Sequence, residues 1–179
     1  MKKAEVKKLV VAAMFVALAV SLSTFSFPIG ASKCFPIQHM VNVLSAVFLG
    51  PFYGVLVAFC TSLIRNLLGT GTLLAFPGSM VGALCCGLVY KISRKFIPTY
   101  IAEVVGTGIL GGIIAFPVAS LAMGREAALF TYVVPFLVST LGGTVIAAVL
   151  IALMCKSHAF NTLTDLLEDN SAPTKTKAS

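Results

Sequence analysis

Six apolar runs dominate this chain, and most are long enough to form a helix that crosses a membrane. They cover about residues 9–25, 38–49, 52–68, 79–90, 100–121 and 131–154. A helix needs about 20 mostly apolar residues to span a bilayer. Charged residues make up 11% of the chain, whereas a soluble protein carries about 25%. We therefore predict an all-α membrane protein with six transmembrane helices.

Basic residues indicate how these predicted helices are oriented. The side that holds both termini has eight Lys or Arg residues next to the spans, and the opposite side has three: Lys33, Arg65 and Arg125. Loops on the cytoplasmic side are enriched in Lys and Arg, so both termini are predicted to be cytoplasmic. We expect a transmembrane substrate-binding domain over residues 1–155 in the cell membrane. A cytoplasmic polar tail over residues 156–179 is predicted to be disordered beyond about Asn170.

Other motifs argue against several kinds of site. The five cysteines lie mostly in apolar runs without CxxC or Cys/His ligand spacing, which favours buried side chains over a metal site or disulfide. The segment Gly69-Thr70-Gly71-Thr72 is not followed by the GK[ST] of a P-loop, so ATP binding by this chain is not expected. The net charge of +7 comes from residues beside the spans. We therefore expect neither a cofactor nor a nucleic-acid partner.

Two polar segments, residues 33–42 and 65–72, interrupt the apolar sequence and form the candidate binding site. Polar side chains at membrane depth are energetically expensive and usually line a cavity or pathway. If a helix begins at Gln38, then Gln38 and Asn42 share one face with His39 beside them. Such amides and imidazoles suit hydrogen bonding to a small heterocycle. The predicted substrate-binding residues are Lys33, Gln38, His39, Asn42, Arg65, Asn66, Thr70, Thr72 and Tyr132.

Several of these residues also have structural interpretations. Lys33 can anchor at lipid headgroups, and Tyr132 can lie at the membrane interface. Arg65 either complements the C-terminal dipole of its helix or pairs with an anionic group of the substrate. Glu103 is the one acidic residue in the predicted spans. We expect it to pair with Arg94 or Lys95, with a role in ligand binding or coupling as the alternative.

Two sequence blocks carry a resemblance to a known family. Residues 28–39 read PIGASKCFPIQH and are followed by NVLSA at 42–46, and residues 65–79 read RNLLGTGTLLAFPGS. Over about residues 7–155 the chain resembles the ThiW family of substrate-binding S components of energy-coupling factor (ECF) vitamin transporters. The resemblance implies an S-component-like bundle that binds hydroxyethylthiazole, a thiazole precursor of thiamine. It also implies that Ala13 and Ala17 contact a transmembrane T component, and that two ABC ATPases supply ATP hydrolysis.

Two other functions stay open at this level. A self-sufficient secondary carrier would need no partner ATPase. An intramembrane enzyme would need a nucleophile and a base, and the chain offers Cys34 and His39 with no carboxylate nearby in sequence to orient the imidazole. We expect a transporter subunit rather than an enzyme. The sequence leaves open whether the ligand is an alcohol or a phosphate.

Overall fold

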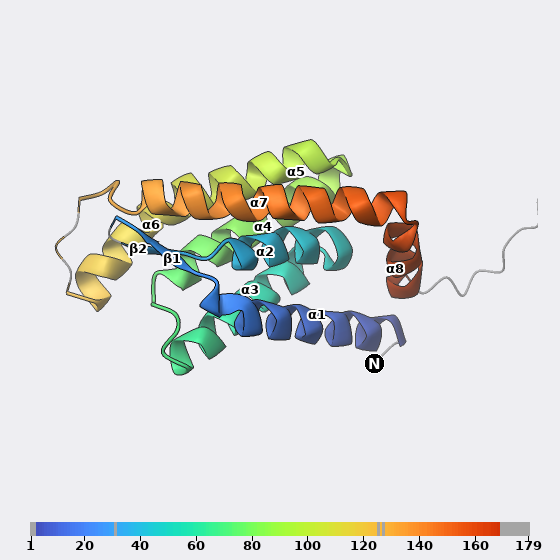
Figure 1. The fold of residues 1–179 in the computed structure, drawn as a ribbon, viewed down its shortest axis with the longest axis horizontal. Helices are drawn as coiled ribbons and strands as arrows, with labels where there is room; N and C mark the ends of the chain where they lie inside the picture. Colours follow the sequence, from blue (N-terminus) through green and yellow to red (C-terminus); the bar gives the residue numbers. More distant parts are fainter. Residues whose placement is uncertain (1–2, 31, 125, 127, 169–179) are drawn as a thin grey trace, which may run out of the picture.

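The chain folds into an elongated helical bundle, seen in a computed structural model that describes residues 3–30, 32–124, 126 and 128–168 (Figure 1). Both the described N-terminal end and helix α8 lie at one end of the bundle, here called the terminal end. A small hairpin lies toward the opposite end, here called the cap end. The main helices are α1 (Lys3–Ser21), α2 (Pro36–Leu49), α3 (Pro51–Leu67), α4 (Ala75–Ser93), α5 (Phe96–Glu103), α6 (Gly112–Pro117), α7 (Val133–Lys156) and α8 (Ala159–Leu167).

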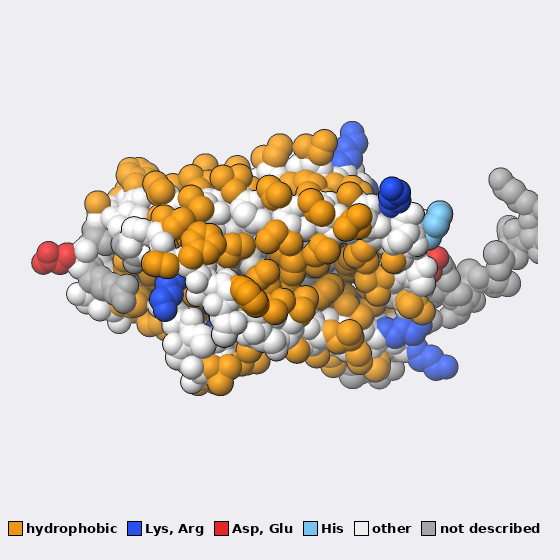
Figure 2. Space-filling model, in the orientation of Figure 1, with side chains coloured by type: hydrophobic (Ala, Val, Ile, Leu, Met, Phe, Trp, Pro, Cys, Tyr) orange, Lys and Arg blue, Asp and Glu red, His pale blue; other side chains and the backbone are white. Residues whose placement is uncertain are grey.

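Four stretches of the described residues are long and apolar enough to cross a membrane: Lys3–Thr24, Ala75–Ser93, Phe96–Ala122 and Val133–Lys156. The helices Pro36–Leu49 and Pro51–Leu67 are apolar but shorter. On the face shown in Figure 2, apolar side chains cover the middle of the molecule and charged ones lie toward its ends. The all-α membrane architecture is thus confirmed. Six spans and cytoplasmic termini stay predictions.

The stretch Phe96–Ala122 is not a uniform α-helix. It passes from α5 into a π-helical segment, η2 (Val104–Gly111), then through α6 into a second one, η3 (Val118–Ala122). Pro117 ends α6 where its ring removes a backbone donor. π-helical turns are rare and often occur at functional sites. The first of them begins directly after Glu103.

Helix α2 lies at the centre of the bundle, packed against α3, α4 and α7. All residues from Gln38 to Leu49 are buried. Pro36 starts this helix, where its missing N–H group costs nothing. Gly50, with a φ of +85°, turns the chain directly into α3 at Pro51. A short helix enclosed on several sides can carry polar residues on any face, provided that its neighbours satisfy them.

Close contact between α2 and α7 fixes the beginning of α2. A Cβ atom placed on Gly143 of α7 would lie 2.3 Å from the carbonyl oxygen of Pro36 and 2.6 Å from Cβ of His39. Small residues let helix backbones approach in this way in membrane proteins. The position of His39 therefore depends on a glycine in α7, more than 100 residues later in the chain.

The interior of the terminal end is apolar and includes α8. Phe160 of α8 packs against Phe48, with ring centroids 5.1 Å apart, and against Phe96 at 5.6 Å. Leu167 is also buried there. The sequence predicted only a polar tail from residue 156, so this helix was missed. The predicted disorder beyond about Asn170 lies outside the described residues, which end at 168.

The cap end carries a hairpin of β1 (Phe27–Ile29) and β2 (Ser32–Cys34), paired antiparallel with Pro28 opposite Lys33. Two bonds attach it to α7. The Phe35 N–H group donates to Ser139 Oγ at 2.8 Å, and Cys34 Sγ donates to the Pro135 carbonyl at 3.2 Å. These bonds hold β2 over the start of α2.

The loop between α3 and α4 forms the other part of the cap end. The Asn66 side chain donates to the carbonyls of Ser62, at 2.8 Å, and Thr72, at 3.0 Å. The Thr70 and Gly71 N–H groups both donate to the Arg65 carbonyl at the end of α3. Helix α4 then begins at Ala75, four residues earlier than the sequence predicted.

Candidate functional site

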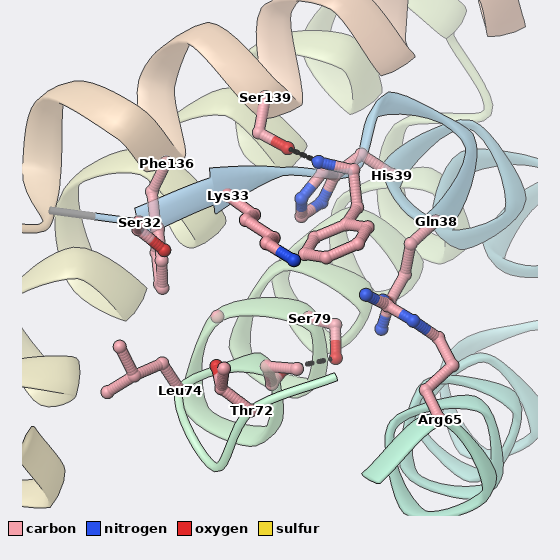
Figure 3. A pocket seen from close by; sticks show the side chains of 13 residues that line it. Ser32, Lys33, Gln38, His39, Arg65, Thr72, Leu74, Ser79, Phe136 and Ser139 are labelled. Atoms are coloured by element: carbon pink, nitrogen blue, oxygen red, sulfur yellow. Dashed lines mark hydrogen bonds between the residues drawn. The ribbon is translucent and has the colours of Figure 1, made fainter. Parts of the chain in front are cut away.

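A small cavity lies inside the bundle, below the hairpin and the α3–α4 loop. Its free volume is about 30 Å³, enough for only one or two water molecules. Side chains from β2, α2, α3, α4 and α7 reach it (Figure 3). The lining residues are Ser32, Lys33, Phe35, Gln38, His39, Arg65, Thr72, Leu74, Ala75, Gly78, Ser79, Phe136 and Ser139.

The structure brings the two polar sequence segments together at this cavity. Lys33, Gln38 and His39 come from the first segment, and Arg65 and Thr72 from the second. Gln38 and His39 are buried, whereas Lys33 is exposed and extends toward the cavity from β2 (Figure 3). Five of the nine predicted binding residues therefore line one hollow.

Arg65 is the most deeply buried charge in this group. It lies in the last turn of α3 and is 1% exposed. Its Nη1 group donates to Gln38 Oε1, and its guanidinium carbon lies 3.7 Å from the centroid of the Phe35 ring. Nε and Nη2 have no hydrogen-bond partner among the residues that the structure describes. The dipole of α3 favours a cation at this position, but it provides no hydrogen-bond acceptor for these two N–H groups.

Gln38 connects Arg65 to a chain of serine hydroxyls. Its Nε2 donates to Ser62 Oγ at 3.0 Å, and Ser62 Oγ lies 3.0 Å from Ser79 Oγ. Ser79 in turn donates to the Ala75 carbonyl at 2.7 Å. With both ends of its amide bonded, Gln38 is held in one orientation.

Behind the cavity wall lies a buried network around Glu103, which is fully buried. Its Oε1 atom is 3.1 Å from His39 Nδ1, and it accepts from Asn42 Nδ2 at 3.0 Å and Thr107 Oγ1 at 3.0 Å. Asn42 also donates to the Ser79 carbonyl at 3.1 Å. Asn42 thus supports the wall of the cavity from behind, without lining it.

The expected pairing of Glu103 with Arg94 or Lys95 is wrong. Arg94 and Lys95 are exposed at the terminal end, and Arg94 lies over the Tyr90 ring. Glu103 is eight residues beyond Lys95, about 12 Å along a helix. Its side chain points instead into the bundle, where His39 and Asn42 offer hydrogen bonds that a buried carboxylate needs.

The remaining predicted residues lie around the cavity. Thr70 is exposed in the α3–α4 loop, and Asn66 fixes the shape of that loop. Tyr132 is buried with its ring centroid 6.4 Å from that of Phe136, which does line the cavity. Next to the cavity, an outer cleft of about 360 Å³ is lined by Thr70 and by four residues common to both spaces: Ser32, Lys33, Thr72 and Leu74.

Sequence reasoning missed part of the wall. Ser79 of α4 and Phe136 of α7 lie within predicted apolar runs, and no local pattern separates them from lipid-facing residues. Phe76 of α4 packs against Phe59 and is not part of this wall. The partner of His39 was also missed, because Glu103 follows it by 64 residues.

The arrangement suits binding better than catalysis. Glu103 does orient His39, contrary to the expectation from the sequence. The Cys34 thiol, however, is buried and donates to the Pro135 carbonyl. Burial raises the pKa of Cys34, which disfavours the thiolate that a nucleophile needs.

Comparison with known proteins adds the deciding observation. The family model described as thiamine-precursor transporter protein (ThiW) matches residues 9–157. The chain belongs to the ThiW family. The match includes every residue of the cavity wall and all four candidate membrane-crossing stretches except the first residues of α1. Membership of the ThiW family therefore identifies the chain as a multi-pass membrane protein that transports a thiamine precursor.

No curated protein and no solved structure matches the chain.

Proposed function

We propose that this chain is the substrate-binding S subunit of an ECF-type importer, and that its ligand is a thiazole precursor of thiamine built on hydroxyethylthiazole. The observation that carries this proposal is the cavity at the cap end of an apolar bundle, lined by both polar and aromatic side chains, in a member of a thiamine-precursor transporter family. Ligand sites of this kind combine apolar walls with a few fixed polar groups.

The cavity wall offers both kinds of contact that a small thiazole needs. The rings of Phe35 and Phe136 provide aromatic surface. With its Nδ1 bonded to Glu103, His39 has its second ring nitrogen left for a ligand. Ser139 and Gln38 add a hydroxyl and an amide.

A ligand larger than water requires the cavity to expand. Lys33 is exposed, and Ser32 and Thr72 are half-buried in the cap. These side chains can rotate without moving the helices, and such rotations are common when ligands bind. The proposed ligand would therefore enter from the outer cleft.

The proposed partners are a transmembrane T component and two ABC ATPases. Ala13 and Ala17 of α1 are exposed and line an apolar groove between α1 and α3. Small residues on such a face allow a second helix to approach closely. The lipid of the cell membrane would cover the rest of this surface.

Binding by the purified chain alone tests the proposal. Detergent-solubilised protein is titrated with three labelled compounds: hydroxyethylthiazole, its phosphate monoester, and the derivative that carries a carboxylate on the thiazole ring. A pyrimidine is the negative control. We expect saturable binding of at least one thiazole at one site per chain. Failure of folded protein to bind any of the three would overturn the substrate assignment.

Uptake by proteoliposomes separates the S subunit from a self-sufficient carrier. Vesicles that contain this chain alone are expected to bind the thiazole without accumulating it, even with an ion gradient. Gradient-driven accumulation by the chain alone would overturn the S-subunit role and establish a secondary carrier.

A further inference from the structure

The guanidinium of Arg65 is buried, and it has no negative partner within the described part of the chain. No carboxylate of the described residues forms an ion pair with it. Glu103, the acidic residue inside the same part of the bundle, is bonded instead to His39, Asn42 and Thr107. An uncompensated charge out of water is strongly unfavourable. A site with this arrangement is completed when a ligand supplies the anion.

The unsatisfied donors of Arg65 have a definite geometry. Nη1 is occupied by Gln38, and the ring of Phe35 covers one face of the guanidinium. The two groups without partners, Nε and Nη2, form one edge of the planar fork. Parallel N–H groups on one edge match two oxygens of a carboxylate or a phosphate.

A second cation belongs to the same cavity wall as Arg65. Lys33 lines the same cavity, and its ammonium group extends toward the cavity from β2 (Figure 3). Among the described residues, no acidic side chain lines either the cavity or the adjoining cleft. The wall is therefore positive on the side of Arg65 and Lys33, and polar but uncharged at Ser79 and Ser139.

We infer that Arg65 forms an anion subsite, and that the ligand is a thiazole that carries a negative group, as a phosphate monoester or a ring carboxylate, rather than the free alcohol. This inference rests on the proposed function for the thiazole ring. The Nε–Nη2 edge of Arg65 binds two oxygens of the anion, and Lys33 closes over it from β2.

Competition among three probes tests the subsite. Hydroxyethylthiazole, its phosphate monoester and its ring carboxylate are titrated into the same purified protein. We expect one of the two anionic forms to bind at least tenfold more tightly than the alcohol. Comparison of the phosphate monoester with the ring carboxylate then identifies which anion the site holds. Equal or tighter binding of the alcohol would overturn the anion subsite and leave the proposed function standing. Absence of binding by all three would overturn both.

Variants of Arg65 test whether this side chain causes the preference for an anionic thiazole over the alcohol. Arg65→Met is expected to bind the alcohol and the anions within about threefold of one another. Arg65→Lys keeps the charge but loses the fork, and is expected to keep only part of the preference. Arg94→Met is the matched control, because it removes an exposed arginine at the terminal end and is expected to keep the full preference. An undiminished preference in Arg65→Met would overturn the assignment.

A measurement on the unmodified chain covers the case in which Arg65→Met fails to fold. Inorganic phosphate is added to wild-type protein at constant ionic strength, with chloride as the control ion. We expect phosphate to compete with the anionic thiazole and to weaken its apparent affinity more than chloride does. Identical effects of the two ions would overturn the subsite.

Discussion

Two hollows of this molecule differ in almost every physical property. The cavity at the cap end has a free volume of about 30 Å³, and its wall combines charged, amide and hydroxyl groups with the rings of Phe35 and Phe136. The groove between α1 and α3 is open, has a volume of about 480 Å³ and is lined almost entirely by apolar side chains such as Leu9, Val16 and Leu56. No described residue lines both hollows.

This difference indicates that ligand recognition and contact with a partner or lipid belong to separate regions of the molecule. Polar groups recognise a solute only where water is excluded and each donor has a fixed direction. A groove of small apolar residues lacks that selectivity, but it fits another helix or lipid chains. Substitutions in the cavity should therefore change binding, and those in the groove should change only transport.

The largest effect is expected for Ala13→Trp in the groove. The indole would fill the space between α1 and α3 that a partner helix needs, so uptake in cells that contain the whole importer should be abolished. Binding by the purified variant should be unchanged, as measured by titration. Met14→Trp is the control, because Met14 is exposed on α1 but does not line the groove. Loss of binding in Ala13→Trp would contradict the separation of the two regions.

A large effect on stability is expected for Glu103→Leu behind the cavity. The change removes the acceptor of His39 Nδ1 and of one N–H of the Asn42 amide, whose Nδ2 keeps its bond to the Ser79 carbonyl. Each buried N–H left without an acceptor costs about 1–3 kcal/mol. Thermal unfolding in detergent and ligand titration measure the result. Glu103→Gln keeps an acceptor oxygen and should retain most of the stability. Equal stability of the two variants would show that the network contributes nothing.

A smaller effect is expected for Asn42→Ala. Asn42 donates to the Ser79 carbonyl and to Glu103, so its loss should loosen the cavity wall. We expect binding weaker by more than tenfold, about 1.4 kcal/mol or more, and similar for every thiazole that binds. Ser45→Ala, one turn further along α2, is the control. Unchanged affinity in Asn42→Ala would remove this residue from the site.

The smallest effect is expected for Ser139→Ala. Its hydroxyl accepts the Phe35 N–H bond that attaches the hairpin to α7, and such a bond contributes about 0.5–1.5 kcal/mol. Affinity should fall by less than in Asn42→Ala, in a titration with the same ligand. Ser120→Ala, in η3 and outside the cavity wall, should have no effect. A loss larger than that of Asn42→Ala would make Ser139 a direct ligand contact.

Much of the helical framework could be predicted from the sequence. Apolar runs bounded by glycine and proline placed the helix ends to within about six residues, because a lipid-exposed backbone must satisfy its own hydrogen bonds. Gly50-Pro51 marked the sharp turn between α2 and α3. The helix α8 was missed, since its burial depends on Phe48 and Phe96, which belong to distant segments.

The candidate site was predictable only where polarity stood out locally. Gln38, His39 and Arg65 are conspicuous in an apolar sequence, and all three line the cavity. The role of Glu103 was not accessible, because its direction depends on how α5 packs against α2. Ser79 and Phe136 look like ordinary residues of an apolar helix until the fold places them.

The four residues common to the cavity and the outer cleft have a kinetic consequence. Ser32, Lys33, Thr72 and Leu74 belong to a hairpin strand and a loop, and such segments rearrange in nanoseconds to microseconds. Passage toward the terminal end would instead require α2, α4 and α7 to separate, a collective motion of microseconds to milliseconds or slower. The isolated chain should thus exchange its ligand through the cap side alone. The dissociation rate of the ligand then measures how often the hairpin strand and the loop move apart.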